Sequence, residues 1–131
     1  SHPFIVMNGD VLTKFNLSRI LEFHTLNDAI ATLAVRQYVL NVPFGVVETD
    51  GINIKKMTEK PNYHKNVSAG VYALNPDIFN FLKKGKMDMP SLFQDLISNN
   101  KKVIACPIHE YWIDIGRPES LKEAYSTWDE E

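Results

Sequence analysis

The first apolar stretch of the chain is a continuous run, Phe4–Met7, that ends abruptly in Asn8-Gly9-Asp10. A run that is apolar on both faces predicts a strand buried in the middle of a parallel sheet. Open α/β sheets bind ligands just beyond the carboxyl ends of such strands, which places Asp10 to meet a ligand or a metal. Asn-Gly and Gly-Asp are also ordinary turn dipeptides, and on this stretch alone the two interpretations are about even.

Farther along, the hydrophobic pattern alternates between strand-like and helix-like segments. Apolar residues at helical spacing predict a helix from an N-cap at Asn16 or Ser18 to about Asn27. Asp50-Gly51 is a hairpin signal between two strands, so part of the sheet is antiparallel. Further strands are expected at 30–38, 44–49, 52–59, 67–74, 102–108 and 111–115, and further helices at 76–84 behind an Asn75 cap, from about 90 to 98, and at 119–128. Residues 61–66 are expected to form a loop. The predicted class is α/β with a mixed, mainly parallel sheet and flanking helices.

The composition and net charge of the chain exclude several classes of protein and partner. A chain of 131 residues with 44% hydrophobic and 23% charged residues suits a single soluble globular domain over 1–131. The formal net charge of −2 gives no electrostatic reason to expect nucleic acid or a membrane surface as a partner. No apolar run is long enough to span a bilayer, and no signal peptide is evident. The single cysteine, Cys106, excludes an internal disulfide and favours a reducing compartment, so we expect a cytoplasmic protein.

Three further stretches carry candidate chemistry. In Thr58-Glu59-Lys60-Pro61 a carboxylate beside an ammonium group offers acceptors for sugar hydroxyls and a cation for phosphate. Neighbours in a strand point to opposite faces, so Glu59 and Lys60 share a ligand only where the strand ends or bends, and Pro61 makes such an end plausible. Taken alone, an isolated Glu-Lys pair is more often a solvated charge pair.

The other two stretches lie on later strands. Small residues in Asn66–Tyr72 let a ligand or another backbone approach closely, although a β-bulge or tight packing is at least as good an explanation. In Tyr111–Pro118 an acid, Asp114, stands between two apolar residues and before a glycine. Burying such an acid unpaired is costly, so it either caps the last helix or serves as a second metal carboxylate.

Together these motifs, in their order along the chain, resemble the sugar-1-phosphate nucleotidyltransferases, also called nucleotide-diphospho-sugar pyrophosphorylases. The resemblance rests on five short motifs: Asn8-Gly9-Asp10, Phe44-Gly45-Val46-Val47, Glu59-Lys60-Pro61, Ser68–Tyr72 and Trp112–Pro118. It implies a Rossmann-like nucleotide-diphospho-sugar transferase fold and a reaction in which a nucleoside triphosphate and a sugar 1-phosphate give an NDP-sugar and pyrophosphate with Mg²⁺. Around Glu59-Lys60-Pro61 and Trp112–Pro118 the sequence is most similar to the mannose-1-phosphate guanylyltransferase-like branch, which implies GTP and mannose 1-phosphate.

The resemblance also implies residue roles. Asp10 and Asp114 match the family's two metal-binding aspartates, which are catalytic. Glu59 matches the carboxylate that accepts sugar hydroxyls, and Lys60 the lysine that meets the sugar phosphate. The remaining matches to the sugar pocket are Gly45, Ser68, Ala69, Gly70 and Tyr72.

One family feature is missing from the sequence. Members begin with a glycine-rich loop that carries an Arg and then a Lys and holds the triphosphate, whereas the glycines here stand singly. Ser1-His2 resembles the scar of an expression tag. We therefore expect the C-terminal, sugar-phosphate-binding portion of the fold, inactive by itself and self-associating through the exposed edge at Phe4–Met7. The alternative is a non-catalytic regulatory or assembly module.

Overall fold

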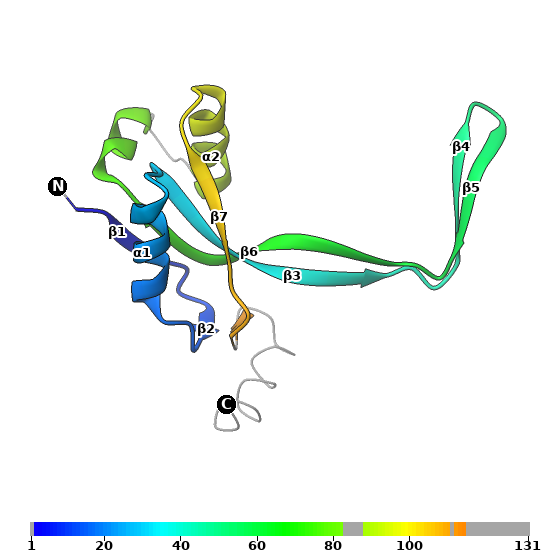
Figure 1. Ribbon diagram of the computed structural model, residues 1–131, viewed down its shortest axis with the longest axis horizontal. Helices are drawn as coiled ribbons and strands as arrows, with labels where there is room; N and C mark the ends of the chain where they lie inside the picture. The colour runs from blue at the N-terminus through cyan, green and yellow to red at the C-terminus, as the bar shows by residue number, and fades with distance from the viewer. Residues whose placement is uncertain (1, 83–87, 111, 115–131) are drawn as a thin grey trace. The chain divides into compact units, whose positions relative to one another are not determined.

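The computed structural model describes residues 2–82, 88–110 and 112–114, and for Leu12, Ile113 and Asp114 it describes the backbone (Figure 1). The chain divides into two compact units. The first unit combines the residues up to Arg36 with those from Ser68 onward, and the second comprises Gln37–Val67. The predicted helix at 119–128 lies outside the described residues.

The first unit is built on a sheet with the strand order β1-β6-β3-β7. Strand β1 (Phe4–Met7) pairs antiparallel with β6 (Asn62–Leu74), and β3 (Ala31–Asn41) pairs in parallel with β7 (Val103–Pro107). A separate two-stranded antiparallel ladder joins β2 (Val11–Thr13) to β8 (Trp112–Asp114). The mixed α/β class is as predicted, and antiparallel pairing takes a larger share than expected.

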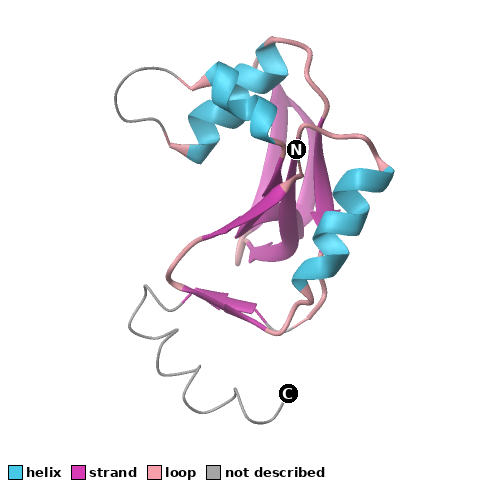
Figure 2. Ribbon diagram, turned by 90° about the vertical axis from the view of Figure 1, so that its left-hand side faces the viewer, coloured by secondary structure: helices cyan, strands magenta, loops and turns pink. Residues whose placement is uncertain are grey.

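Helices cover both faces of this sheet (Figure 2). Helix α1 (Leu17–Leu26) covers one face, where Ile20 packs against Ala34 and Ala69. The 3₁₀ helix η1 (Pro76–Phe81) and helix α2 (Met89–Ser98) cover the other, where Leu92 and Leu96 pack. Each helix therefore buries its apolar stripe against the sheet. None of the described helices is both long and apolar enough to cross a bilayer.

The prediction of a strand at Phe4–Met7 is correct, but its placement as a buried strand in the middle of a parallel sheet is wrong, because β1 pairs antiparallel with β6, Phe4–Val6 are half-buried and Met7 is exposed. Among the described strands β1 has β6 as its only neighbour, so it forms an edge. Both faces are nevertheless packed, because Ile5 lies against the cluster under α1 while Phe4 and Val6 lie against the cluster under η1 and α2. Apolar residues on both faces of a strand therefore indicate packing on both faces. They do not indicate how many strands pair with it.

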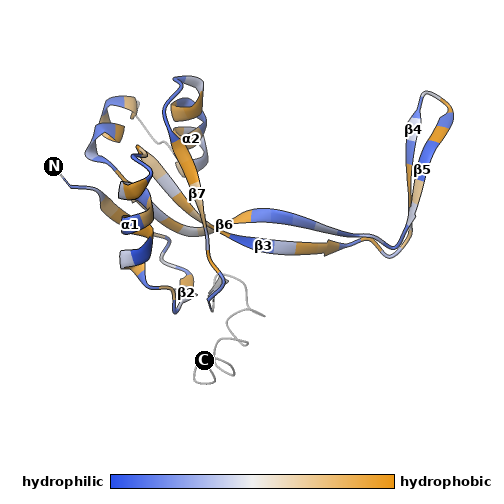
Figure 3. Cartoon of the chain, in the orientation of Figure 1, coloured by the Kyte–Doolittle hydropathy of each residue, from blue (hydrophilic) through white to orange (hydrophobic). Residues whose placement is uncertain are grey.

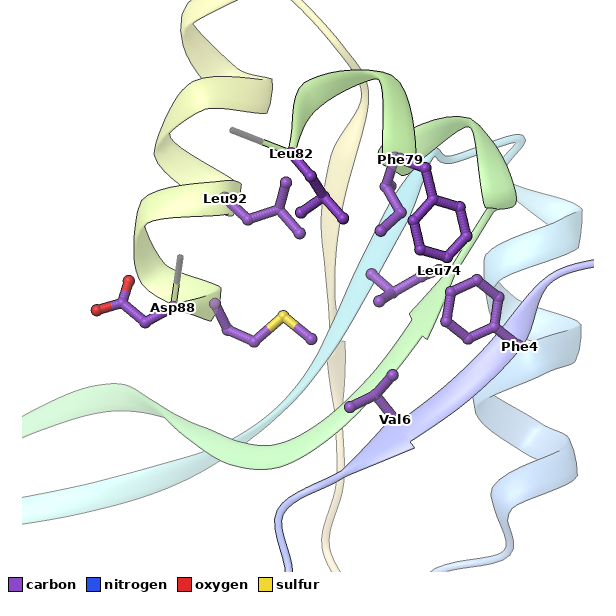
Figure 4. A pocket seen from close by; sticks show the side chains of 9 residues that line it. Phe4, Val6, Leu74, Phe79, Leu82, Asp88 and Leu92 are labelled. Carbon is purple, nitrogen blue, oxygen red and sulfur yellow. The ribbon is translucent and has the colours of Figure 1, made fainter. Parts of the chain in front are cut away.

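An apolar groove of about 220 Å³ runs beside β1 (Figure 4). It is lined mainly by side chains of β1, β6, η1 and α2, and the ring of Phe4 stacks on that of Phe79 with centroids 5.9 Å apart. Phe79, Leu82 and Ile97 stand at helical spacing, a pattern that is typical of core residues, but they are 59%, 43% and 53% exposed. Ile78 takes the buried position instead, because η1 is a tighter 3₁₀ helix with a different residue spacing.

The second unit contains an antiparallel hairpin of β4 (Gly45–Asp50) and β5 (Asn53–Glu59). The predicted Asp50-Gly51 turn closes it, with Gly51 at φ +60° and a register irregularity between Glu48 and Thr49. Hydrophobic and hydrophilic residues are interspersed along both strands of the hairpin (Figure 3). The predicted loop at 61–66 is wrong, because β6 already begins at Asn62, where Asn41 Nδ2 donates to Asn62 Oδ1 at 2.8 Å.

Buried polar contacts in the first unit correct another local prediction. Asn75 makes no side-chain cap for η1. Its Oδ1 lies 2.8 Å from His24 Nε2, and its Nδ2 donates to the Ala29 carbonyl at 3.1 Å. His24, which is 1% exposed, also contacts Thr32 Oγ1 at 2.6 Å, so the Asn75 amide links the start of η1 to α1 and, through His24, to β3.

Candidate functional site

The turn Asn8-Gly9-Asp10 connects β1 to β2 and is anchored on β6. The backbone N–H of Asn8 donates to the Gly70 carbonyl at 2.8 Å, and the N–H of Val11 donates to the Asn8 carbonyl at 3.3 Å. Asp10 follows this anchor with an exposed side chain. Both interpretations of the stretch are therefore compatible with the structure, since a tight turn presents a free carboxylate at the end of a strand.

Gly70 is the residue against which this turn packs. It has φ +72°, and a Cβ built there would lie 2.7 Å from Asn8 Nδ2 and 3.0 Å from Val11 Cγ2. Only glycine combines that backbone conformation with so close a neighbour. The small residues in Ser68–Gly70 thus serve at least to admit the side chain of Asn8, while the Ser68 hydroxyl accepts from the Gly70 N–H at 3.1 Å.

The ladder between β2 and β8 brings the second predicted metal residue to the same place. The register pairs Val11 with Asp114, so the backbone of Asp114 lies across from the residue that directly follows Asp10. The side chain of Asp114 lies outside the described residues. No cluster of three or more His, Cys, Asp or Glu side chains occurs in the described part, which does not include that carboxylate. The shared metal site stays a prediction.

Trp112 joins β8 to two strands of the main sheet, a role that sequence reasoning missed. Its indole Nε1 donates to the Ala69 carbonyl at 2.5 Å. On its ring face lies the guanidinium carbon of Arg36 in β3, 4.7 Å from the centroid. A lone tryptophan and a lone arginine 76 positions apart give no sequence signal for this contact, which depends on the topology.

The other predicted sugar ligands belong to the second unit. Glu59 is the last residue of β5, and Lys60 has φ +43°, so the strand does end between them as the sequence suggested. The N–H of Lys60 donates to the Phe44 carbonyl at 3.2 Å, and Gly45 pairs with Glu59 in the ladder. A Cβ at Gly45 would stand 3.5 Å from Glu59 Oε2, and both charged side chains are exposed.

Tyr72 and Cys106 are core residues. The Tyr72 ring is 7% exposed and lies 5.8 Å from the ring of Phe93, with an interplanar angle of 59°. The structure therefore places Tyr72 in the apolar cluster under α2 rather than on an exposed wall. Cys106 is buried, and burial raises the pKa of its thiol, which favours the protonated form.

Comparison with known proteins identifies the family of the chain. The model of the family described as "Nucleotidyl transferase" matches residues 1–131. The chain belongs to the nucleotidyl transferase family. A glucose-1-phosphate adenylyltransferase of Clostridium perfringens is 34% identical over 92% of this chain and 34% of its own length. A probable mannose-1-phosphate guanylyltransferase of Arabidopsis thaliana is 29% identical over 88% of this chain and 36% of its own.

Solved structures agree on the fold. HddC from Yersinia pseudotuberculosis superimposes with a TM-score of 0.67 at 21% identity, covering 98% of this chain and 56% of that protein. A UDP-glucose pyrophosphorylase complexed with UDP-glucose gives a TM-score of 0.62 at 23% identity, covering 98% and 57%. The chain spans about a third of the length of the curated relatives it matches.

Proposed function

We propose that the chain is the sugar-phosphate-binding portion of a sugar-1-phosphate nucleotidyltransferase. The observation that carries the proposal is the β2–β8 register, which sets Asp114 opposite the residue after Asp10 on a turn anchored at Gly70. Three motifs that are far apart in sequence thereby meet at one end of the first unit. A turn that served only to reverse the chain would not need a second acid brought beside it.

The proposed reaction is a phosphoryl displacement without a covalent enzyme intermediate. A phosphate oxygen of the sugar 1-phosphate attacks the α-phosphorus of a nucleoside triphosphate, and the bond from that phosphorus to the bridging oxygen of the β-phosphate breaks. The products are an NDP-sugar and pyrophosphate. Such a step requires alignment of two anionic substrates and neutralisation of their charge.

Asp10 and Asp114 are the residues that would hold Mg²⁺. The donor set fits, because Mg²⁺ prefers hard carboxylate oxygens and binds through one or two carboxylates together with substrate phosphates. When bound, the ion supplies charge neutralisation at the phosphates. The chain's own contribution is the anchored turn, whose backbone hydrogen bonds hold the main chain on both sides of the exposed Asp10.

Glu59 and Lys60 are the proposed contacts to the sugar and its phosphate. The end of β5 and the left-handed conformation of Lys60 free these neighbouring side chains from the strict alternation of a strand. Gly45, paired with Glu59, leaves the carboxylate uncrowded, and its backbone is the proposed contact to a sugar hydroxyl. Ser68, Ala69 and Gly70 are the proposed pocket residues of the first unit. The pair of substrates we favour is mannose 1-phosphate and GTP.

A second candidate function is a non-catalytic regulatory or assembly module with the same fold. Both candidates agree that the chain alone releases no pyrophosphate from a sugar 1-phosphate and a nucleoside triphosphate. We propose in addition a cytoplasmic location and self-association through the free edge of β1.

Binding separates the two candidates. We expect the chain to bind mannose 1-phosphate in the presence of Mg²⁺, measured by isothermal titration calorimetry. Lys60→Ala should weaken binding about 10–100-fold, because a hydrogen bond to a charged group contributes about 1.5–3 kcal/mol. Lys56→Ala is the matched control, since Lys56 is exposed on the same strand and pairs across the hairpin with Glu48. Absence of binding to any sugar 1-phosphate would contradict the assignment as part of an enzyme. The non-catalytic regulatory or assembly module would then be the remaining candidate.

A further inference from the structure

Arg36 carries a charge that the described residues leave uncompensated. Its guanidinium stacks on Trp112 at 4.7 Å, the residue is half-buried, and no ion pair joins it to a carboxylate in the described part of the chain. Partial burial strips water from a cation and is unfavourable unless an anion or hydrogen-bond acceptors replace that water. A position of this kind is suited to an anion supplied from outside the described residues.

Arg19 provides an internal comparison. Its guanidinium also lies over an aromatic ring, 5.5 Å from the centroid of Phe15, but it forms an ion pair with Glu110. Arg19 is exposed as well, so water solvates the rest of its charge. The two arginines thus share aromatic stacking and differ in burial and in having a carboxylate partner. Stacking alone does not explain why the more buried of the two is the one without that partner.

Trp112 fixes Arg36 beside the proposed site. The indole donates to the carbonyl of Ala69, and the next carbonyl, that of Gly70, accepts from the N–H of Asn8 in the turn that presents Asp10. Trp112 also lies two positions before Asp114 in β8. The guanidinium is therefore held by the same short segment of β6 that anchors the Asp10 turn.

We propose that Arg36 is a phosphate-binding residue of the sugar 1-phosphate site and that Trp112 is the positioning residue that holds its guanidinium. The proposal rests on the proposed function and extends it by one residue. A guanidinium is planar, permanently charged and weakly hydrated, and its rigid fork of donors matches two phosphate oxygens at once. Stacking on the indole restricts the fork to one plane and lowers the entropy lost when the phosphate binds.

The test compares charged and neutral sugars on four proteins: the wild-type chain, Arg36→Gln, Arg36→Lys and the control Arg19→Gln. Calorimetry with Mg²⁺ gives the dissociation constants for mannose 1-phosphate and for mannose. We expect Arg36→Gln to weaken mannose 1-phosphate about 10–100-fold, and Arg36→Lys to weaken it less, because the charge remains while the fork is lost. Arg19→Gln should leave the affinity unchanged. Circular dichroism verifies that each variant is folded.

A second measurement needs no variant that could fail to fold. In ¹⁵N-labelled wild-type chain, mannose 1-phosphate should shift the side-chain N–H resonance of Arg36 saturably, with the dissociation constant found by calorimetry, whereas mannose should not. The proposal would be contradicted if mannose 1-phosphate left the Arg36 resonance unchanged, or if Arg36→Gln and Arg19→Gln bound it with equal affinity. The contact between Arg36 and Trp112 would then have only a structural role. If the wild-type chain binds no sugar 1-phosphate at all, the proposed function itself is contradicted. That outcome differs from one in which the wild-type chain binds the ligand and Arg36 plays no part.

Discussion

Gly70 determines how closely the Asp10 turn approaches β6. Replacing it by alanine forces an L-residue to φ +72° and places a Cβ 2.7 Å from Asn8 Nδ2. We expect Gly70→Ala to lower the free energy of unfolding by about 1–3 kcal/mol, measured by urea denaturation. Gly9→Ala is the control, because a Cβ at Gly9 meets no atom within 4 Å. Equal effects of the two substitutions would contradict the close packing of Asn8 on Gly70.

Asp10 is the proposed metal ligand whose side chain the structure describes. Asp10→Asn keeps the shape and removes the charge, so we expect Mg²⁺ affinity to fall at least about tenfold in a calorimetric titration. Asp114→Asn should cause a comparable loss if both residues bind one ion. Asp77→Asn, a change at an exposed acid in η1, should have no effect. Mg²⁺ affinity that is the same in Asp10→Asn and in wild type would remove Asp10 from the site.

At the residue scale the sequence indicates which groups carry chemistry but not which of them touch. Asp10 and the end of a strand at Glu59 followed from local patterns, namely an apolar run that stops and a proline after a charged pair. The stack of Arg36 on Trp112 joins β3 to β8, and such a contact exists only once the strands are placed. The close approach of Gly70 to Asn8, which is 62 positions away, is likewise visible only in the folded chain.

At the scale of single elements, the N-cap of α2 links stability to pH. The hydroxyl of Ser91 and then its backbone N–H, which donates to Asp88 Oδ1 at 2.9 Å, lower the pKa of Asp88 below its ordinary value. The stabilisation by this carboxylate is therefore complete above about pH 4 and is lost as the pH falls through the lowered pKa. Asp88→Asn retains the acceptor, so it should remove this part of the pH dependence.

The comparison of urea unfolding at pH 7 and pH 3 measures this effect. The stability difference between wild type and Asp88→Asn should change between the two pH values, since the other carboxylates contribute equally to both proteins. Asp88→Ala, which lacks any cap, should be less stable than wild type at pH 7. A difference between wild type and Asp88→Asn that does not change with pH would show that the carboxylate does not cap α2.

Elements whose ends are set by neighbouring residues in the sequence could be predicted. Elements that depend on a contact with a distant segment could not. Helix α1 begins after its Asn16 cap, where Oδ1 accepts from the Ser18 N–H at 3.0 Å, because capping needs only neighbours in sequence. Residues 62–66 are polar and carry no strand pattern, yet they extend β6 beside the distal part of β3. Asparagine is a common N-cap residue, but the side-chain amide of Asn75 contacts the buried His24 instead of capping η1.

At the scale of the whole molecule, β1 leaves an unusual edge. An edge strand is ordinarily protected by charges, prolines or bulges, whereas Phe4–Met7 contains none of these and packs on both faces. The apolar groove lined by Phe4 and Val6 lies along the same strand. A second copy of the chain can satisfy both features by adding a strand to the sheet and covering the groove.

We therefore expect the purified chain to self-associate in a concentration-dependent manner, measured by sedimentation velocity. Met7→Lys adds a charge at the most exposed residue of β1, which is 38% exposed, and should shift the equilibrium toward monomer by disfavouring strand addition. Leu26→Lys is the control, because Leu26 is 85% exposed on α1 and does not line the apolar groove beside β1. A stable wild-type monomer, or equal dissociation by the two substitutions, would show that β1 is not the contact.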